Sequence, residues 1–110
     1  MKERRRYPRI STSILINLLD SENKTPKCQG CIRNLSLGGV ALESDTKLTV
    51  GTNLLLRINI PIEVLGKIVW IEQYGKSYKY GIKFKKISLF DKLKLKKYIE
   101  TKLKTQKPLE

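Results

Sequence analysis

The hexapeptide Asn34-Leu35-Ser36-Leu37-Gly38-Gly39 carries the clearest local signal in this chain of 110 residues. On an extended strand, side chains two residues apart point to the same face, so Asn34 and Ser36 share one face and the two leucines the other. The leucines suit a core, and the paired glycines permit the positive φ of a tight turn. The sequence therefore predicts a strand that ends with an amide and a hydroxyl beside bare backbone. An ordinary hairpin end would have the same residues, and this alternative stays open here.

Apolar runs before and after the hexapeptide predict further strands. The run 13–19 is rich in β-branched residues, and the polar segment 20–26 predicts a loop. We expect the other strands at residues 28–36, 40–44, 52–60, 62–73 and 78–86. Six short strands joined by turns favour a closed or half-closed antiparallel barrel, which removes the exposed edges of an open sheet. The predicted fold class is all-β with a C-terminal helix, built on a six-stranded antiparallel β-barrel.

The C-terminal segment predicts a helix that ends near Thr105. Ser88 and Asp91 have the spacing of a capping box, with aspartate in place of the usual glutamate. Apolar residues cover about half of the helical wheel, and this arc is expected to dock on the barrel. Its members are Leu89, Phe90, Leu93, Ile99 and Leu103. Lys96 falls inside the arc, so the amphipathic pattern is imperfect.

The positive charge of the chain is concentrated at its two ends. The net charge is +13, and residues 1–9 contribute five basic residues against one glutamate. Residues 83–107 contribute ten lysines against two acidic residues. Both ends therefore suit an anionic partner, although a lysine-rich helix face can also be merely solvated.

The composition indicates one small globular domain. Hydrophobic residues make up 40% of the chain and charged residues 30%, and no apolar run is long enough to span a membrane. We expect a cytoplasmic protein with a flexible arginine-rich arm at residues 1–12, a barrel-and-helix domain at 13–105 and a mobile tail at 106–110.

The residue types that catalysis and metal binding require are scarce. The chain has no histidine, so Ser36 has no histidine to activate it, and the acidic residues are scattered through turns. Cys28 and Cys31 have the spacing of a redox or zinc pair, but no second pair completes four ligands. The pair also lies in a predicted strand rather than at the start of a helix. We expect two ordinary thiols in a reducing compartment, no metal site, no cofactor and no enzymatic activity.

A run of arginines precedes the first predicted strand. Arg5 and Arg9 are four residues apart in Arg4-Arg5-Arg6-Tyr7-Pro8-Arg9. A guanidinium can donate two hydrogen bonds to O6 and N7 of guanine, or to a phosphate. The amide oxygen of Asn34 can accept from the opposite edge of guanine. Arg-x-x-x-Arg followed by Asn-x-Ser-x-x-Gly resembles the two-part signature of the PilZ domain, a receptor for cyclic di-GMP. The stretches 66–70 and 80–84 also resemble later strands of that family.

The resemblance implies a non-enzymatic cyclic di-GMP receptor that signals to a downstream protein partner. The ligand-binding residues that it implies are Arg5, Arg9, Asn34, Ser36 and Gly39. The arginine register is ambiguous, which adds Arg4 and Arg6 to the candidates, and Gly38 is added beside Gly39. Like-charge repulsion among the arginines predicts an arm that is disordered without ligand and becomes ordered when the ligand binds.

The alternative function is that of a small basic β-barrel that binds RNA or DNA. Such a barrel needs aromatic side chains as stacking platforms, and the candidates are Trp70, Tyr74, Tyr78 and Tyr80. As core and turn residues, these aromatic side chains would need no ligand. The arginines clustered at one end, together with the Asn34 and Ser36 pair, favour the cyclic dinucleotide.

Overall fold

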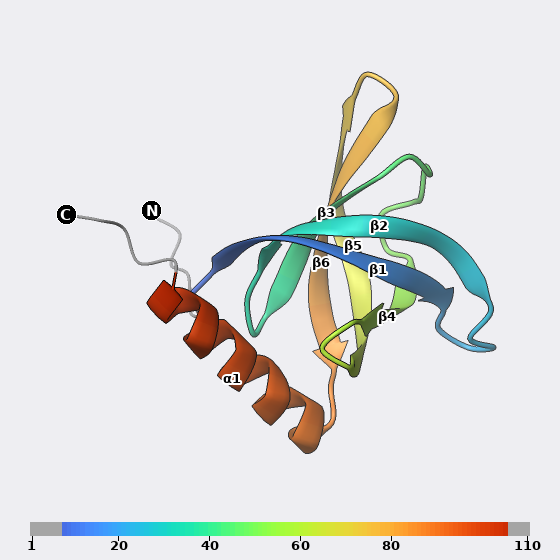
Figure 1. Ribbon diagram of the computed structural model, residues 1–110. Coiled ribbons are helices and arrows are strands. Elements are labelled where there is room, and N and C mark those ends of the chain that lie inside the picture. The colour runs from blue at the N-terminus through green and yellow to red at the C-terminus, as the bar shows by residue number, and fades with distance from the viewer. Residues whose placement is uncertain (1–7, 106–110) are drawn as a thin grey trace, which may run out of the picture.

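The computed structural model describes residues 8–105, which form six strands and one helix (Figure 1). In chain order these are β1 (Ile10–Asp20), β2 (Pro26–Leu35), β3 (Gly39–Ser44), β4 (Asn53–Ile58), β5 (Ile62–Tyr74), β6 (Ser77–Lys86) and α1 (Leu89–Thr105). The strands close into an antiparallel barrel in the order β1-β2-β3-β6-β5-β4. This confirms the predicted fold class.

The barrel begins slightly earlier in the chain than expected. β1 starts at Ile10 rather than at Ser13, because the side chain of Ile10 is buried in the core. The predictions for most of the arm, at residues 1–7, and for the tail at 106–110 lie outside the described residues.

The register of the strands explains which residues form the core. Directly paired residues on antiparallel strands point to the same face of a sheet. Ile10 pairs with Leu35, Leu35 with Val40, and Val40 with Ile82, and all four side chains are buried. The adjacent row of partners, one residue along each strand, must therefore face outward, and that row contains Asn34.

The face through which the helix α1 packs on the barrel differs in part from the predicted one. Leu95 and Ile99 are buried, whereas Leu89, Phe90 and Leu93 are exposed. The predicted docking arc is therefore wrong for three of its five residues. Ile99 and Leu103, the other two, do pack against the core.

The contacts at the start of α1 give the physical reason. The predicted cap is present, because the backbone N–H of Asp91 donates to Oγ of Ser88 at 3.1 Å. The Asp91 carboxylate accepts a hydrogen bond from the backbone N–H of Glu63 on β5, at 3.3 Å. This contact turns Asp91 toward the barrel, and Leu95 and Ile99, four and eight residues later, lie on the same side. Within the described part of the chain, no helix has the length and apolar character that a membrane crossing would require.

Candidate ligand-binding site

A cavity of about 340 Å³ lies on the outer surface of the barrel, where the turn between β2 and β3 meets β5 and β6. Five of the residues singled out from the sequence line it: Arg9, Asn34, Ser36, Gly38 and Gly39. The structure thus brings the last arginine of the N-terminal motif together with the whole of the second motif. The other three arginine candidates, Arg4, Arg5 and Arg6, lie outside the described residues.

One row of strand partners forms the floor and walls of this cavity. Asn34 pairs with Ala41, Ala41 with Gly81, and Gly81 with Trp70. All four residues line the cavity. Since Ala41 and Gly81 have almost no side chain, they leave a hollow between the Asn34 amide on one side and the Trp70 indole on the other.

Two β-bulges bring the walls of the cavity to the surface. The register shifts between Ile32 and Asn34 in β2, and between Ile68 and Trp70 in β5. An extra residue reverses the alternation of inward and outward side chains. Ile68 is therefore buried while Trp70, two residues later, is 40% exposed.

Trp70 was singled out from the sequence only as a stacking candidate of the alternative nucleic-acid function, and not as a residue of the cyclic di-GMP site. A signal was available in the opposite strand. A glycine inside a strand often marks a close approach of another group. A Cβ atom at Gly81 would collide with the Trp70 indole, so the ring rests directly on the Gly81 backbone.

The hydroxyl of Ser36 holds the turn between β2 and β3. Its Oγ donates to the Gly39 carbonyl at 3.3 Å and accepts from the Gly38 N–H at 3.1 Å. The Ser36 N–H also donates to the Gly39 carbonyl, at 3.0 Å. These bonds use the donor of the hydroxyl and leave one lone pair for a ligand.

Gly39 is needed for a reason other than the one expected. Positive φ occurs at Gly51, Gly75 and Lys24 in the described part of the chain, so the expectation of positive φ at the Gly38-Gly39 pair is wrong. A Cβ atom at Gly39 would instead collide with the carbonyl oxygen of Ile82 on β6. Glycine at this position therefore allows two strands to approach closely.

The charged side chains that line the cavity are cationic. Arg9 and Lys83 are both exposed there, and no acidic residue occurs among the described lining residues. Lys83 is the direct partner of Gly39 across β3 and β6, so it lies beside the turn. Lys83 has no distinctive signal in the sequence, since it is one lysine among many. The cavity therefore combines positive charge, an amide and an aromatic face, which together suit an anionic nucleotide.

The two cysteines lie outside this cavity. Both are free thiols, and their spacing places them on opposite faces of β2. Cys28 packs against the core, and Sγ of Cys31 lies 3.9 Å from Oγ of Ser13. Among the residues that the structure covers, no three His, Cys, Asp or Glu side chains are grouped to hold a metal ion.

A closed β-barrel with a cationic, aromatic-lined cavity on its outer wall has the features of a small-ligand receptor. The family model that matches the chain is the PilZ domain, over residues 3–101. The chain therefore belongs to the PilZ domain family, whose members are non-enzymatic receptors of cyclic di-GMP.

Solved structures share this fold. The inhibitor of motility of Bacillus subtilis (MotI/DgrA) matches with a TM-score of 0.81 and 19% identity, over 97% of this chain and 55% of that one. The PilZ domain of Escherichia coli YcgR with c-di-GMP matches with a TM-score of 0.71 and 19% identity, over 96% of this chain and 100% of that one. The K. pneumonia MrkH–c-di-GMP complex matches with a TM-score of 0.75 and 19% identity, over 96% of this chain and 55% of that one.

At 19% identity, these structural matches show that the fold is shared. The chain spans about half the length of MotI and of MrkH. No curated protein sequence matches it.

Proposed function

We propose that this chain is a receptor for cyclic di-GMP and binds it in the cavity between the β2–β3 turn and β5–β6. One observation carries the proposal. Arg9, which precedes β1, lines the same cavity as the Asn34–Gly39 segment, although the two are far apart in the sequence. Membership of the PilZ family supports this assignment. Two of the similar structures, those of YcgR and MrkH, are complexes with c-di-GMP.

Each lining residue has a role that follows from its chemistry. Arg9, together with Arg5, binds phosphate and the Hoogsteen edge of guanine through its donor fork. The Asn34 carbonyl accepts from the N1–H and N2 amine on the other edge. Trp70 offers a flat face on which a purine can stack, and Lys83 adds charge for a phosphate. The free lone pair of Ser36 accepts from the base.

The proposal includes a signalling step. Ligand binding neutralises the arginines of residues 1–9 and orders this segment across the Asn34 and Ser36 face, which creates a new surface for a partner protein. The compartment is proposed to be the cytoplasm, because free thiols such as Cys28 and Cys31 persist in reducing surroundings.

Calorimetric titration with cyclic di-GMP tests the binding, with GTP and RNA as controls. Charge-assisted hydrogen bonds contribute about 1.5–3 kcal/mol each. Arg5→Ala and Arg9→Ala should therefore weaken binding by about ten- to a hundredfold. Arg57→Ala is the matched control, since Arg57 forms a surface ion pair with Glu63 away from the cavity and should leave affinity unchanged.

Salt distinguishes the dinucleotide from a nucleic acid. Cyclic di-GMP has two phosphates, so its affinity should fall by less than about tenfold between low and physiological salt. A nucleic-acid site that contacts several phosphates would lose roughly a thousandfold or more over the same range. Tight RNA binding with such a steep dependence, and no binding of cyclic di-GMP, would replace the proposal by the nucleic-acid function.

A further inference from the structure

The start of α1 exposes three large apolar side chains. Phe90 is 78% exposed, Leu89 70% and Leu93 54%. The helix is already held on the barrel by the buried Leu95 and Ile99, so these three side chains are not needed for its docking. We call Leu89, Phe90 and Leu93 the apolar tip. Exposed apolar groups gathered in one place typically mark an interaction surface.

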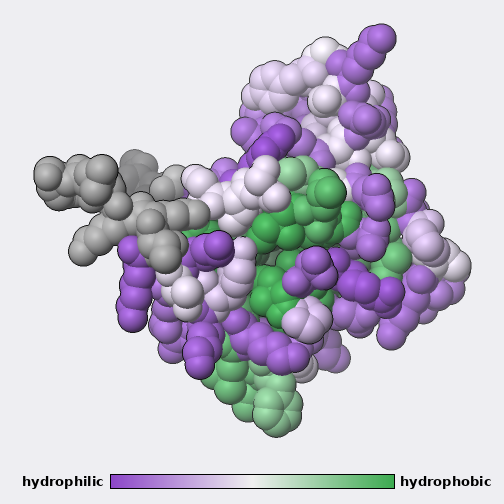
Figure 2. All heavy atoms as spheres, in the orientation of Figure 1, coloured by the Kyte–Doolittle hydropathy of each residue, from purple (hydrophilic) through white to green (hydrophobic). Residues whose placement is uncertain are grey.

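The apolar tip protrudes from the molecule. Figure 2 shows apolar surface at the lower end of the molecule, and Figure 1 places the first turn of α1 at this end. The three side chains therefore form a projection rather than a groove. A projection of this kind inserts into its partner and does not receive a segment of it.

Lysines border the apolar tip along the helix. Lys94 and Lys97 follow Phe90 and Leu93 by four residues, so they lie next to the tip on the same face. Both lysine side chains are exposed. Long lysine side chains can lay their methylene stems on apolar surface while the ammonium group reaches a polar layer.

A basic hollow lies beside the first turn of α1, which contributes Lys92 to its lining. Lys85, Lys86 and Lys92 line a hollow of about 580 Å³, together with apolar groups that include Phe84. Two acidic side chains close to the start of α1 have partners, although Asp91 keeps its charge. Asp91 accepts from the Glu63 N–H, and the Glu63 carboxylate lies 2.8 Å from the Arg57 guanidinium. The five lysines around the apolar tip outnumber these carboxylates and the exposed Glu100 of the same helix, so this surface is positive.

We infer that the apolar tip docks on an anionic lipid bilayer. Phe90 and the two leucines enter the boundary between headgroups and acyl chains, while the lysines contact lipid phosphates. Exposed aromatic and aliphatic side chains beside lysines are two features that hold peripheral proteins at an anionic bilayer interface. Each lysine near an anionic membrane surface adds to the attraction.

Charge argues against a second copy of the chain as the occupant, because two molecules with a net charge of +13 repel each other through this basic face. The inference is independent of cyclic di-GMP binding and is tested without that ligand.

Co-sedimentation of the full chain with vesicles tests the inference. One set of vesicles is phosphatidylcholine, and the other contains phosphatidylglycerol in addition. The chain should bind the anionic vesicles and not the neutral ones, and added salt should weaken binding. Absence of binding to anionic vesicles would overturn the inference and leave an acidic protein as the partner of this surface.

Paired variants separate insertion from general charge attraction. Phe90→Ser with Leu93→Ser should reduce vesicle binding by about tenfold, because the inserting groups are lost. Leu15→Ser with Val50→Ser is the matched control, since these side chains are 75% and 54% exposed but lie outside α1. Thermal melts should show that both double variants are folded. Equal binding by the two double variants would contradict insertion of the tip.

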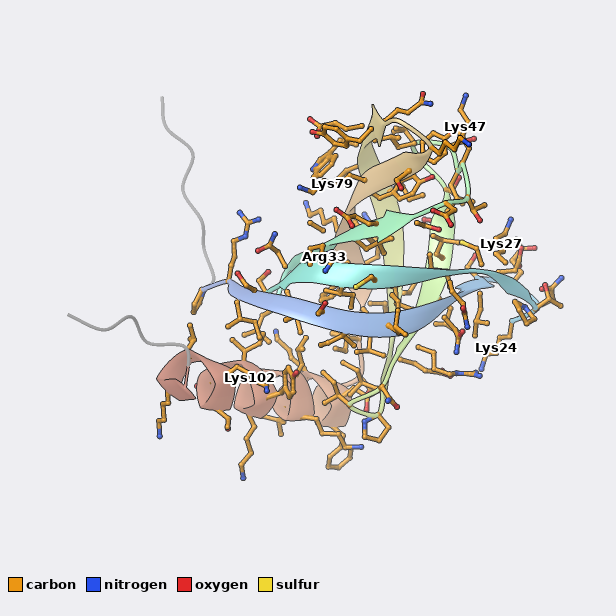
Figure 3. All side chains as sticks on the ribbon, turned by 45° about the horizontal axis from the view of Figure 1, so that its top comes forward. Lys24, Lys27, Arg33, Lys47, Lys79 and Lys102 are labelled. Atoms are coloured by element: carbon orange, nitrogen blue, oxygen red, sulfur yellow. The ribbon has the colours of Figure 1, made fainter. Side chains whose placement is uncertain are left out.

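A second pair of variants locates the charge contribution. Lys86→Glu with Lys92→Glu should also reduce binding by about tenfold, since both lysines border the tip. The control, Lys47→Glu with Lys76→Glu, makes the same change in net charge. Figure 3 shows Lys47 at the far side of the barrel from α1, and Lys76 lies between β5 and β6, in the hairpin that Figure 1 shows at the top. Equal losses for the two pairs would mean that the attraction is not centred on the tip.

Discussion

Trp70 gives the most direct test of where the ligand binds at the scale of single residues. It is the only tryptophan in the chain, so its fluorescence reports on this cavity. Stacking of a base on an aromatic ring contributes about 1–3 kcal/mol. Trp70→Ala should therefore lower cyclic di-GMP affinity by about five- to a hundredfold in a calorimetric titration. Because the indole is only 40% exposed and rests on Gly81, a thermal melt should first show that the variant is folded at the temperature of the titration.

A control on the same strand sharpens this prediction. Tyr74 is also exposed on β5 but does not line the cavity, so Tyr74→Ala should leave the affinity unchanged. Titration of the wild type should change the tryptophan fluorescence. If the ligand binds and the fluorescence of Trp70 stays constant, the ligand does not reach the proposed face.

The steric role of Gly39 can be tested by adding a methyl group at this position. In Gly39→Ala the new methyl group meets the Ile82 carbonyl oxygen, and this backbone atom cannot rotate away. Overpacking of this kind typically costs about 1–3 kcal/mol, so the urea midpoint should fall. Gly30→Ala is the control, because its nearest neighbour is the movable end of the Leu42 side chain, at 2.8 Å, and its nearest backbone atom, the Glu43 carbonyl oxygen, is at 3.1 Å. A larger loss for Gly30→Ala would contradict the steric explanation.

At the scale of elements, α1 is anchored by the face that contains Leu95. This side chain is fully buried, and Leu95→Ala should lower the free energy of unfolding by about 2–5 kcal/mol in urea titrations. Phe90→Ala, on the exposed face, should change it by less than about 0.5 kcal/mol. Comparable losses for the two variants would show that α1 docks through the arc that the sequence indicated.

The proposed switch belongs to the scale of the whole molecule. If cyclic di-GMP orders the segment before β1, amide hydrogen exchange in residues 2–9 should slow when the ligand is added. The same measurement on Arg9→Ala, at equal ligand concentration, should show a smaller effect because that variant binds less ligand. Equal protection of residues 2–9 with and without ligand would disprove the switch and leave the binding proposal standing.

Much of the fold follows from local pattern. Alternating apolar side chains and turn residues mark each strand within a few positions, because burial of one face requires a period of two. The capping residue Ser88 was likewise identified from spacing alone, since a cap depends on its immediate neighbours. Arg9 and Asn34 were chosen as candidates because their side chains carry distinct chemistry in a recognisable order, and the structure places both at one cavity.

The amino-acid sequence by itself determined the barrel, its closing helix and the two motifs of the candidate site, because each depends on residue type and short spacing. Only the tertiary structure decided which faces are exposed. A one-residue bulge turns Trp70 outward, and α1 is rotated so that Leu95 and Ile99 are buried while Asp91 contacts β5. Both outcomes depend on partners distant in sequence, and a shift of one residue or a small rotation exchanges buried and exposed faces without changing the local pattern.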